Sequence, residues 1–583
     1  MYVLGLSCFY HDAAACLLRD GVPVGAASEQ VFTRKKHDPD FPVNAIRWLM
    51  NEAGISVEDI QLVAFYDKPL VKFERILLSH IATFPKSLRQ FVQGMPAWFG
   101  TKLRLDRKLK SELDYTGPIT YGQHHLSHAA SAFYASGFEE AAILTVDGVG
   151  EWATASWGIG RDRKVELLQE IRFPHSLGLL YSAFTFYLGF KVNSGEYKVM
   201  GLAPYGEPIY VDRIKKLIHI REDGTFRLDM RHFTFDHGMR MYNARFEAVM
   251  GAPTRPLDES EPIEQFHKDV ARSLQEVVNE VMTALARKVM RKTGQKRLCL
   301  AGGVALNCVA NGYILRETDV EEVFVQPAAG DAGSAMGAAL WAWHDLLDKP
   351  RRWALSDAYL GPGYSDERVA ADLDRYGAVY HRLERAELLR RTAELIDQAH
   401  VVGWYQGRLE WGPRALGHRS ILGDPRNPEM RDTINLKIKM REGFRPFAPS
   451  CLEEDASKYF DLDRPSPYML LVAPVREEVR SGPLALPAIT HVDGSARIQT
   501  VRQDQDALYY GLLSEFKKQT GCPVLVNTSM NVRGEPIVNT PEDAYRCFMR
   551  TGMDALVCGP FLLLKSEQPE LRLASAAEEF GLD

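Results

Sequence analysis

The sequence predicts an α/β protein of at least two domains, and three observations support this prediction. The chain has 583 residues, which is more than one ordinary hydrophobic core accommodates. Several short apolar segments of strand length lead into glycine-containing loops that are followed by helices. One strand–loop–strand–turn–strand pattern occurs at residues 2–29 and again from residue 143. We therefore expect a duplicated first domain at residues 1–350 and a second α/β domain at residues 351–583.

The first repeat ends its opening strand in a polar loop. Its strands are expected at residues 2–7, 13–18 and 22–29, and the turn Arg19-Asp20-Gly21 joins the last two. His11 and Asp12 lie in the loop after the first strand. A charge run with Lys36 follows at residues 30–41, and such a run is most often a solvated surface.

The second repeat follows a helix that contains histidines. His124 and His128 are four residues apart, so both imidazoles project from one helix face, and His125 points about 100° away. The next strand, at residues 143–146, ends at Asp147, as the first repeat has Asp12 after its own strand. Two imidazoles and a carboxylate suit a divalent transition metal with open positions for substrate. By spacing alone, a solvated histidine pair is the commoner outcome.

Two later strands also end in loops that favour ligand binding. Gly302 and Gly303 precede a helix, and backbone N–H groups in such a loop can approach an anion, although plain tight turns use the same residues. The second loop contains Asp331, a third acid at a strand-to-helix junction. The small residues after Asp331 permit a flat ligand such as adenine to lie against the backbone.

Three other segments of the first domain have simpler interpretations. Residues 68–115 are predicted to form an inserted basic helical region over the cleft, with its apolar residues in the core. Residues 194–206, around Lys198, are predicted to be a glycine-rich loop that approaches a ligand, with a surface pair of Glu196 and Lys198 as the alternative. Residues 262–292 have the spacing of a long amphipathic helix.

The second domain begins after a connector at residues 346–366 and is locally basic. Arginines and lysines are dense between glycines and prolines at residues 406–445, which favours capture of a polyanion because guanidinium groups match phosphate oxygens. An amphipathic basic face is the alternative. A strand at residues 523–526 leads to the amide- and hydroxyl-rich loop 527–531, which suits a carbonyl or phosphate group, with a plain turn as the alternative.

Composition excludes several classes of protein. The net charge of −6 gives no basic field for nucleic acid, and no apolar run is long enough to span a membrane. The N-terminus lacks the cationic start of a secretory signal. None of the eight cysteines forms a CxxC pair, which argues against a zinc ribbon and is typical of buried thiols in a cytoplasmic protein.

The motifs HHLSH, TVDGVGEW, GEYKVMGLAPYG, AGGVALN and GDAGSAMGAA occur in this order, and together they resemble the antibiotic and nodulation-factor O-carbamoyltransferase family over nearly the whole chain. The resemblance implies a duplicated actin-like (ASKHA) ATPase fold for the first domain, similar to the tRNA threonylcarbamoyladenosine transferase. It implies a YrdC-like fold for the second.

The resemblance also implies site residues. Iron(II) or another divalent metal would be bound by His124, His128, Asp147 and Asp331. Phosphate, nucleotide and carbamoyl contacts would come from Gly302, Gly303, Asn307, Gly330, Arg414, Lys439, Arg445, Arg497, Asn527 and Ser529.

The implied reaction has two steps. ATP and carbamoyl phosphate, with Mg²⁺, give carbamoyl adenylate in the second domain. The first domain then transfers the carbamoyl group to a hydroxyl of a small molecule, such as a secondary metabolite or a sugar. His11 or Asp12 is the candidate general base, and Lys36 is expected, by resemblance, to contact the phosphate of the intermediate.

Other functions stay open at this point. An actin-like sugar kinase or ATPase would transfer a γ-phosphate, and a non-enzymatic partner protein would only bind ATP. The hydrogenase-maturation carbamoyltransferase is disfavoured, because its CxxC motifs and its domain order are absent. We expect no nucleic-acid or membrane partner, and a homodimer is an open possibility.

Overall fold

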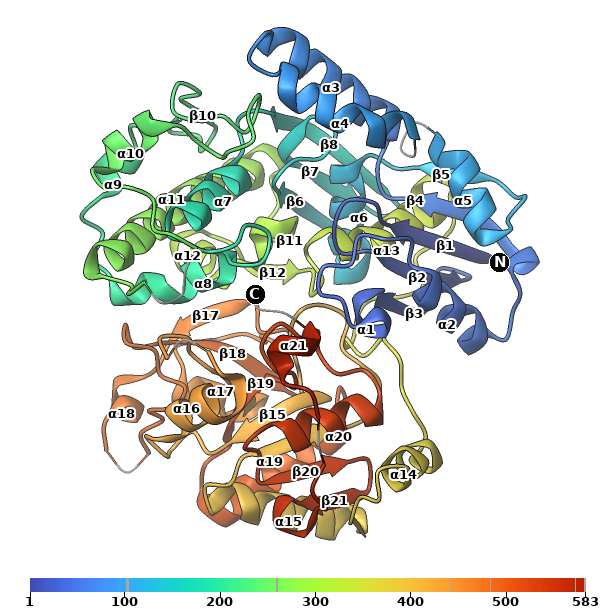
Figure 1. Ribbon diagram of the computed structural model, residues 1–583, viewed down its shortest axis with the longest axis vertical. Coiled ribbons are helices and arrows are strands. Elements are labelled where there is room, and N and C mark those ends of the chain that lie inside the picture. Colours follow the sequence, from blue (N-terminus) through green and yellow to red (C-terminus); the bar gives the residue numbers. More distant parts are fainter. Residues whose placement is uncertain (101–103, 258–260, 442, 483, 572, 581–583) are drawn as a thin grey trace. The chain divides into compact units, whose positions relative to one another are not determined.

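The computed structural model describes residues 1–100, 104–257, 261–441, 443–482, 484–571 and 573–580. These residues divide into two units (Figure 1). The first unit contains residues 1–29 and 39–355, and the second contains residues 30–38 and 356–583. The sequence predicted two contiguous domains, whereas residues 30–38 of the first predicted domain belong to the second unit.

The two five-stranded sheets of the first unit repeat one topology. Their strand orders are β3-β2-β1-β4-β5 and β8-β7-β6-β11-β12. In each sheet the first three strands of the repeat are antiparallel neighbours, and the fourth and fifth strands run parallel to the first. The predicted duplication of one strand topology is therefore confirmed. The strands are β1 (Tyr2–Ser7), β2 (Ala14–Arg19), β3 (Val22–Ser28), β4 (Ile60–Phe65), β5 (Ile119–Tyr121), β6 (Glu140–Val146), β7 (Ala153–Arg161), β8 (Lys164–Arg172), β11 (Arg297–Ala301) and β12 (Glu322–Val325).

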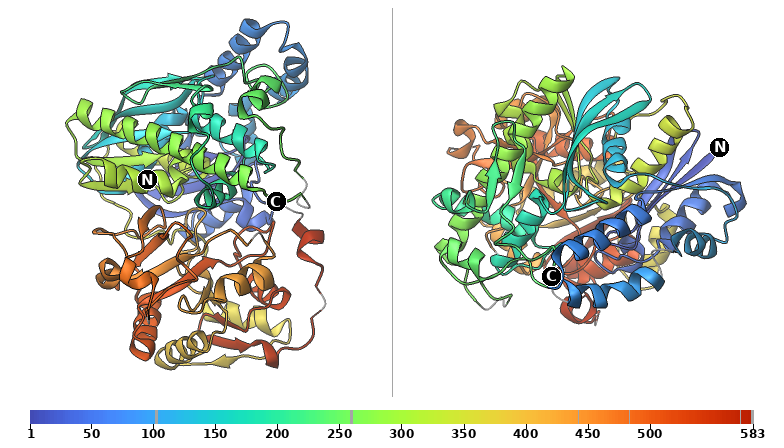
Figure 2. Two further views of the ribbon diagram at one scale, coloured as in Figure 1. Left: turned by 90° about the vertical axis from the view of Figure 1, so that its left-hand side faces the viewer. Right: turned by 90° about the horizontal axis from the view of Figure 1, so that it is seen from above.

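Two helices join the sheets. Helix α13 (Asp331–Trp341) packs against α6 (His124–Ser136) and against β1, β2 and β4, while α6 packs against β6 and β11 (Figures 1 and 2). Glycines permit this close packing: a Cβ on Gly337 would lie 1.8 Å from the Ser127 carbonyl oxygen, and one on Gly5 would lie 2.0 Å from that of Ala335. The small residues that precede and follow Asp331 thus bring the two helices together.

The remaining helices cover the outer faces of the first unit. The predicted insertion consists of α3 (Pro69–Thr83), α4 (Leu88–Gly100) and α5 (Leu105–Leu113), and α3 and α4 lie at an edge of the unit, drawn in blue in Figure 2. Residues 101–103 of this insertion lie outside the described residues. The other elements are α2 (Val43–Ala53), α7 (Leu177–Tyr187), α8 (Glu196–Leu202), α9 (Val211–Ile214), β9 (Ile218–Ile220), β10 (Phe226–Leu228), α10 (Ala244–Met250), α11 (Gln265–Thr293) and α12 (Cys308–Glu317).

The segment around Lys198 was predicted to be a loop, and this prediction is wrong. It forms α8, which packs against α11 and buries Lys198, Val199 and Leu202. Burial of these side chains overrides the local preference that the surrounding glycines indicate, because tertiary packing contributes more than intrinsic propensity.

The second unit is built on one nine-stranded mixed sheet. Its order is β13-β21-β20-β14-β15-β19-β16-β18-β17. A YrdC-like fold for this unit stays a prediction. The strands are β13 (His381–Arg382), β14 (Val402–Tyr405), β15 (Arg419–Gly423), β16 (Ala448–Leu452), β17 (Leu471–Pro474), β18 (Ser495–Val501), β19 (Val524–Ser529), β20 (Ala555–Cys558) and β21 (Phe561–Leu564). The helices are α1 (Gln30–Thr33), α14 (Asp366–Asp374), α15 (Arg385–Asp397), α16 (Met430–Thr433), α17 (Glu453–Tyr459), α18 (Glu477–Arg480), α19 (Ala507–Thr520), α20 (Pro541–Arg550) and α21 (Ala576–Phe580).

Within the described ranges, none of the helices combines the length and the apolar character that crossing a membrane requires.

The contact between α6 and α13 gives a test of the fold. We expect Gly337→Ala to lower the free energy of unfolding by about 1–3 kcal/mol, because its Cβ would overlap the Ser127 carbonyl. Gly94→Ala is the control, since a Cβ at Gly94 has no heavy atom within 4 Å. Thermal unfolding of both variants measures the difference, and equal midpoints would contradict the packing described here.

Candidate functional site

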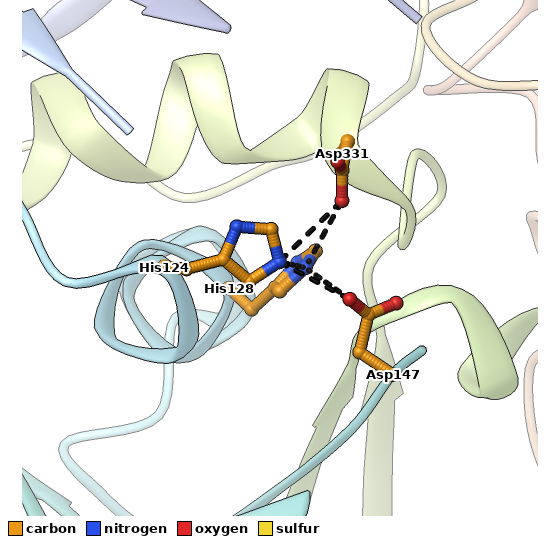
Figure 3. Close-up of side chains that lie close together, drawn as sticks. All are labelled: His124, His128, Asp147 and Asp331. Carbon is orange, nitrogen blue, oxygen red and sulfur yellow. Dashed lines mark hydrogen bonds and ion pairs between the residues drawn. The ribbon is translucent and has the colours of Figure 1, made fainter. Parts of the chain in front are cut away.

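Three elements bring the predicted metal ligands to one point. His124 is the first residue of α6 and His128 lies one turn later, Asp147 follows the last residue of β6, and Asp331 is the first residue of α13. The four side chains point toward one another in Figure 3. Because α6 and α13 pack together, the starts of both helices meet the end of β6.

The ligand atoms have the spacing of a metal centre. Five of their six pairs lie 3.1–3.9 Å apart, and the Nε2 atoms of His124 and His128 are 3.1 Å from each other. All four atoms lie within 4.8 Å of one another. A four-coordinate ion with bonds of about 2.1 Å separates neighbouring ligands by about 3.4 Å. The geometry therefore fits a divalent ion of the transition series.

Neighbouring groups orient these ligands. The Gly303 N–H donates to Asp147 Oδ1 at 2.9 Å, and the Ser334 hydroxyl lies 3.1 Å from His128 Nδ1. In the described part of the chain, the buried Asp331 Oδ2 has no hydrogen-bond partner. A metal-binding histidine ordinarily forms a hydrogen bond through its second ring nitrogen, as His128 does with Ser334. A buried carboxylate oxygen without a partner, such as Asp331 Oδ2, costs free energy unless a cation lies nearby.

The pKa values reflect the same arrangement. Burial alone would lower the pKa of His124, but the charge of Asp331 and the hydrogen bond to Asp147 outweigh it and raise this pKa to about 9. Although burial acts in the opposite direction, the histidines hold the pKa of Asp147 well below its ordinary value. A proton and a metal cation thus compete for the same donor atoms.

His125 does not belong to the cluster. Its Nδ1 lies 3.0 Å from Thr145 Oγ1 and 2.9 Å from Ser156 Oγ, and burial lowers its pKa to about 3. The imidazole is therefore neutral and part of the core, in line with the helical geometry that predicted a different direction for it.

The first loop brings His11 to the cluster. Its Nδ1 lies 2.9 Å from Asp12 Oδ2, and its Nε2 lies 3.8 Å from Asp331 Oδ2. Phe9 and Asp12 have φ values of 71° and 52°, so the backbone turns sharply to present these side chains. The structure thus places both candidate bases beside the predicted metal ligands.

The residues of the glycine-rich loops have local partners. Gly302 adopts φ 88°, and a Cβ there would lie 2.3 Å from the Val146 carbonyl oxygen, so only glycine fits. Asn307 caps α12 by accepting from Ala310 N at 3.0 Å, and its amide also pairs with Gln275. Gly330 precedes the first residue of α13. The Gly303 N–H donates to Asp147 Oδ1, and a role of this glycine in nucleotide binding stays a prediction.

Lys36 lies in the second unit, on the segment 30–38. Arg34, two residues earlier, anchors this segment by donating to the Ile537 carbonyl at 2.7 Å and to Glu535 at 2.9 Å. Lys36 therefore belongs to the second unit, and its contact with a phosphate stays a prediction.

A buried lysine organises the predicted phosphate site of the second unit. Lys439 is 4% exposed, and its ammonium donates to the Ser529 carbonyl and, at 2.7 Å, to Asn531 Oδ1. Burial lowers the pKa of Lys439 well below its ordinary value, and the guanidinium groups of Arg441 and Arg445 lower it further. The structure thus brings Lys439, Arg445 and Ser529 together and adds Asn531, and an arriving anion would relieve the repulsion among the cations.

Asn527 was predicted to lie in a ligand-binding loop, and this placement is wrong. It belongs to β19, is 1% exposed, and donates to Ser450 Oγ and Gln499 Oε1, each at 3.0 Å. It also donates to the carbonyl of Ala415 at 3.3 Å. The strand continues past residue 526 because it pairs with both β15 and β16. Arg414 precedes Ala415, and Arg497 lies on β18 two residues before Gln499.

Comparison with known proteins identifies the family. Residues 2–340 match the carbamoyltransferase N-terminus family, and residues 393–565 match the carbamoyltransferase C-terminus family. The chain belongs to the carbamoyltransferase family.

Relatives of this carbamoyltransferase come from several bacteria. An uncharacterized protein of Synechocystis is 51% identical over all of both chains. Nodulation protein NolNO of Sinorhizobium fredii is 40% identical over 96% of this chain and 79% of its own. The 3'-hydroxymethylcephem-O-carbamoyltransferase of Amycolatopsis lactamdurans is 38% identical over 50% of this chain and 53% of its own.

Several residues of the carbamoyltransferase were missed by the sequence reasoning. Glu151 accepts from the backbone N–H groups of His124 and Lys68, at 3.0 and 2.8 Å, and so fixes the start of α6. Glu410, 5% exposed, accepts from the N–H groups of Leu416 and His418 at 2.8 and 2.9 Å in the arginine-rich segment. Each directly precedes a tryptophan, and this is the local signal that they share.

The metal site can be tested without catalysis. We expect His128→Ala to weaken binding of Fe²⁺ or Co²⁺ about 100-fold or more, because it removes one of four ligands. Isothermal titration with the metal alone measures this change. The exposed His219 supplies the control His219→Ala, and a loss of equal size in both variants would contradict the assignment.

The Ser334 hydroxyl supplies a graded test of the same site. We expect Ser334→Ala to weaken metal binding about 10- to 100-fold, because His128 loses the partner of its Nδ1. Unchanged affinity in this titration would show that the hydroxyl does not orient the imidazole.

Proposed function

We propose that the protein makes carbamoyl adenylate in its second unit and transfers the carbamoyl group to a hydroxyl of a small molecule in its first. Membership of the carbamoyltransferase family supports the group transferred, and the similarity to a 3'-hydroxymethylcephem-O-carbamoyltransferase supports a hydroxyl as acceptor. The observation that carries the proposal is the convergence of His124, His128, Asp147 and Asp331 beside His11 and Asp12.

The first step consumes ATP, carbamoyl phosphate and water, and releases inorganic phosphate and pyrophosphate. Water cleaves the bond between the carbamoyl and phosphate groups of carbamoyl phosphate, which gives carbamate and inorganic phosphate. A carbamate oxygen then attacks the α-phosphorus of ATP, and the bond to pyrophosphate breaks. Lys439, Arg441 and Arg445 support this chemistry because a cluster of cations, with Mg²⁺, stabilises the charge that builds on the phosphates.

The second step transfers the carbamoyl group and releases AMP. The acceptor oxygen forms a bond to the carbamoyl carbon, the bond from that carbon to the adenylate oxygen breaks, and the hydroxyl proton must be removed. The pair His11 and Asp12 is placed to take this proton, with Asp12 orienting the imidazole. A bound divalent ion, iron(II) by family resemblance, would supply Lewis-acid stabilisation of the oxygens that gain charge.

The kinase and the non-enzymatic alternatives fit less well. The match over the second unit belongs to a carbamoyltransferase family and not to a kinase, and the basic cluster around Lys439 has no role in γ-phosphate transfer to a sugar. A kinase would release ADP, whereas the proposed reaction releases AMP and pyrophosphate.

Release of pyrophosphate from ATP, with and without carbamoyl phosphate, tests the proposal. We expect strict dependence on carbamoyl phosphate in the wild type and a loss of about 100-fold or more in Lys439→Ala, since the phosphates lose their central buried cation. Lys437→Ala is the matched control, because this lysine is exposed on the same turn. ADP as the nucleotide product, or release without carbamoyl phosphate, would contradict the proposal.

The same assay separates the two units. We expect His124→Ala to keep carbamoyl-phosphate-dependent pyrophosphate release within about twofold of the wild type, because its ligand cluster lies in the first unit. The wild type is offered hydroxyl probes such as 3'-hydroxymethylcephem, glucose or benzyl alcohol. For each probe that the wild type carbamoylates, we expect His124→Ala to lose the transfer of the carbamoyl group. Loss of pyrophosphate release in His124→Ala would show that the steps are not divided in this way.

A further inference from the structure

Helix α3 in the first unit has a reversed distribution of side chains. It buries Lys72 and Arg75, which are 6% and 7% exposed, while Leu70 and Ile81 are 69% and 63% exposed. Amphipathic helices ordinarily bury their apolar residues and expose their cations. Because burial of a charge costs free energy, two inward-facing cations one turn apart indicate a function.

Lys72 has a partner for its charge. Its Nζ donates to Asp67 Oδ2 at 2.8 Å and lies 4.8 Å from the centre of the Tyr10 ring. This ion pair is complete within the first unit, so Lys72 needs no external ligand.

Arg75 has no such partner. In the described part of the chain its guanidinium makes no hydrogen bond and has no carboxylate within 4.0 Å; its recorded contact is with the Phe173 ring, at 5.0 Å. Glu151 and Asp67 are the nearby carboxylates that act on its pKa, but Glu151 accepts from two backbone N–H groups and Asp67 is paired with Lys72. A guanidinium that is nine-tenths buried and lacks an acceptor suits an incoming anion.

A small aromatic pocket adjoins Lys72. It is lined by Lys72 and Asp67 and by the rings of Tyr10, Tyr66 and Trp98, and its cavity volume of about 20 Å³ is room for about one water molecule. Tyr10 is 47% exposed and forms part of the rim. The exposed Tyr10 ring gives the pocket an aromatic rim, against which an apolar or sugar ring can pack from outside.

The pocket lies next to the metal ligands, and the ring that Arg75 contacts belongs to a loop that hydrogen-bonds beside them. The Tyr66 ring is 5.3 Å from that of His124, and the Tyr10 ring is 4.8 Å from that of His11. Phe173, under Arg75, belongs to the loop in which Ser176 donates to the carbonyls of Asp147 and Gly148. A molecule in this region can therefore present a hydroxyl to the cluster.

We propose that Arg75 binds an anionic group of the acceptor, a carboxylate or a phosphate ester, while the acceptor packs against the aromatic rim at Tyr10 and its hydroxyl faces the cluster of His124, His128, Asp147 and Asp331. This inference rests on the proposed function, because it names the class of acceptor for that site. It selects hydroxyl compounds that carry a negative charge away from the reacting hydroxyl.

Two matched probes test the inference by direct binding to the full-length, metal-loaded protein. We expect 4-(hydroxymethyl)benzoate to bind about tenfold or more tightly than the neutral 4-(hydroxymethyl)benzamide, because only the former offers a carboxylate to the guanidinium. In Arg75→Met this preference should disappear, and in Arg75→Lys part of it should remain. Arg89→Met is the control, since Arg89 is exposed on α4 and should leave the preference unchanged. Titration calorimetry measures all of these affinities.

Three outcomes would overturn the inference. Equal binding of both probes by the wild type would show that no anion site exists, and this comparison needs no variant to fold. A preference that persists in Arg75→Met would place the carboxylate elsewhere, for example on the metal. Weaker binding of AMP in Arg75→Met, with unchanged binding of the benzoate, would assign the guanidinium to the adenylate phosphate. Since no ATP or carbamoyl phosphate is present, these results do not depend on whether the proposed reaction occurs.

Discussion

The mutual repulsion of Asp147 and Asp331 is the constraint on which the first unit depends. Two carboxylates whose oxygens lie within 4.8 Å, both largely removed from water, are stable only when positive charge is shared between them. The imidazoles of His124 and His128 can supply it as bound protons, and a divalent ion supplies more of it at shorter range. The four side chains therefore act as one charged cluster, in which loss of any member leaves the charges of the others uncompensated.

The position of this cluster follows from close packing of the surrounding backbone rather than from the ligands themselves. Gly5 and Gly337 let β1, α13 and α6 approach at distances that a Cβ would prevent, and Gly302 does the same beside the end of β6. The duplicated sheets then present their strand ends at this contact. Close approach of the backbones therefore sets the position of the site. The ligands lie in the first turn or so of α6, at the first residue of α13 and directly after β6, where these elements meet.

The sequence predicted those parts of the site that local geometry determines. The spacing of His124 and His128 defines one helix face, and Asp147 follows an unmistakable apolar strand, so their convergence needs only the duplicated fold. Asn527 and Lys198 were misplaced because pairing with β15 and β16, and packing on α11, extend regular structure beyond the local signals. The roles of Glu151 and Glu410 depend on backbone groups that distant chain segments bring close, and no local period encodes them.

Helix α3 is where the sequence pattern and the structure differ most, and the difference has physical content. The sequence predicted a basic helical insertion with its apolar residues in the core, yet Leu70 and Ile81 are exposed and Arg75 is buried. Reversing this distribution would increase the apolar area that folding buries and remove an uncompensated charge, so selection for stability alone does not produce it. Functional sites commonly retain such locally unfavourable arrangements, because a ligand restores the missing interaction. The burial of Arg75 beside an aromatic pocket and the ligand cluster is such an arrangement, and its cost in the free protein is the reason to expect a charged acceptor.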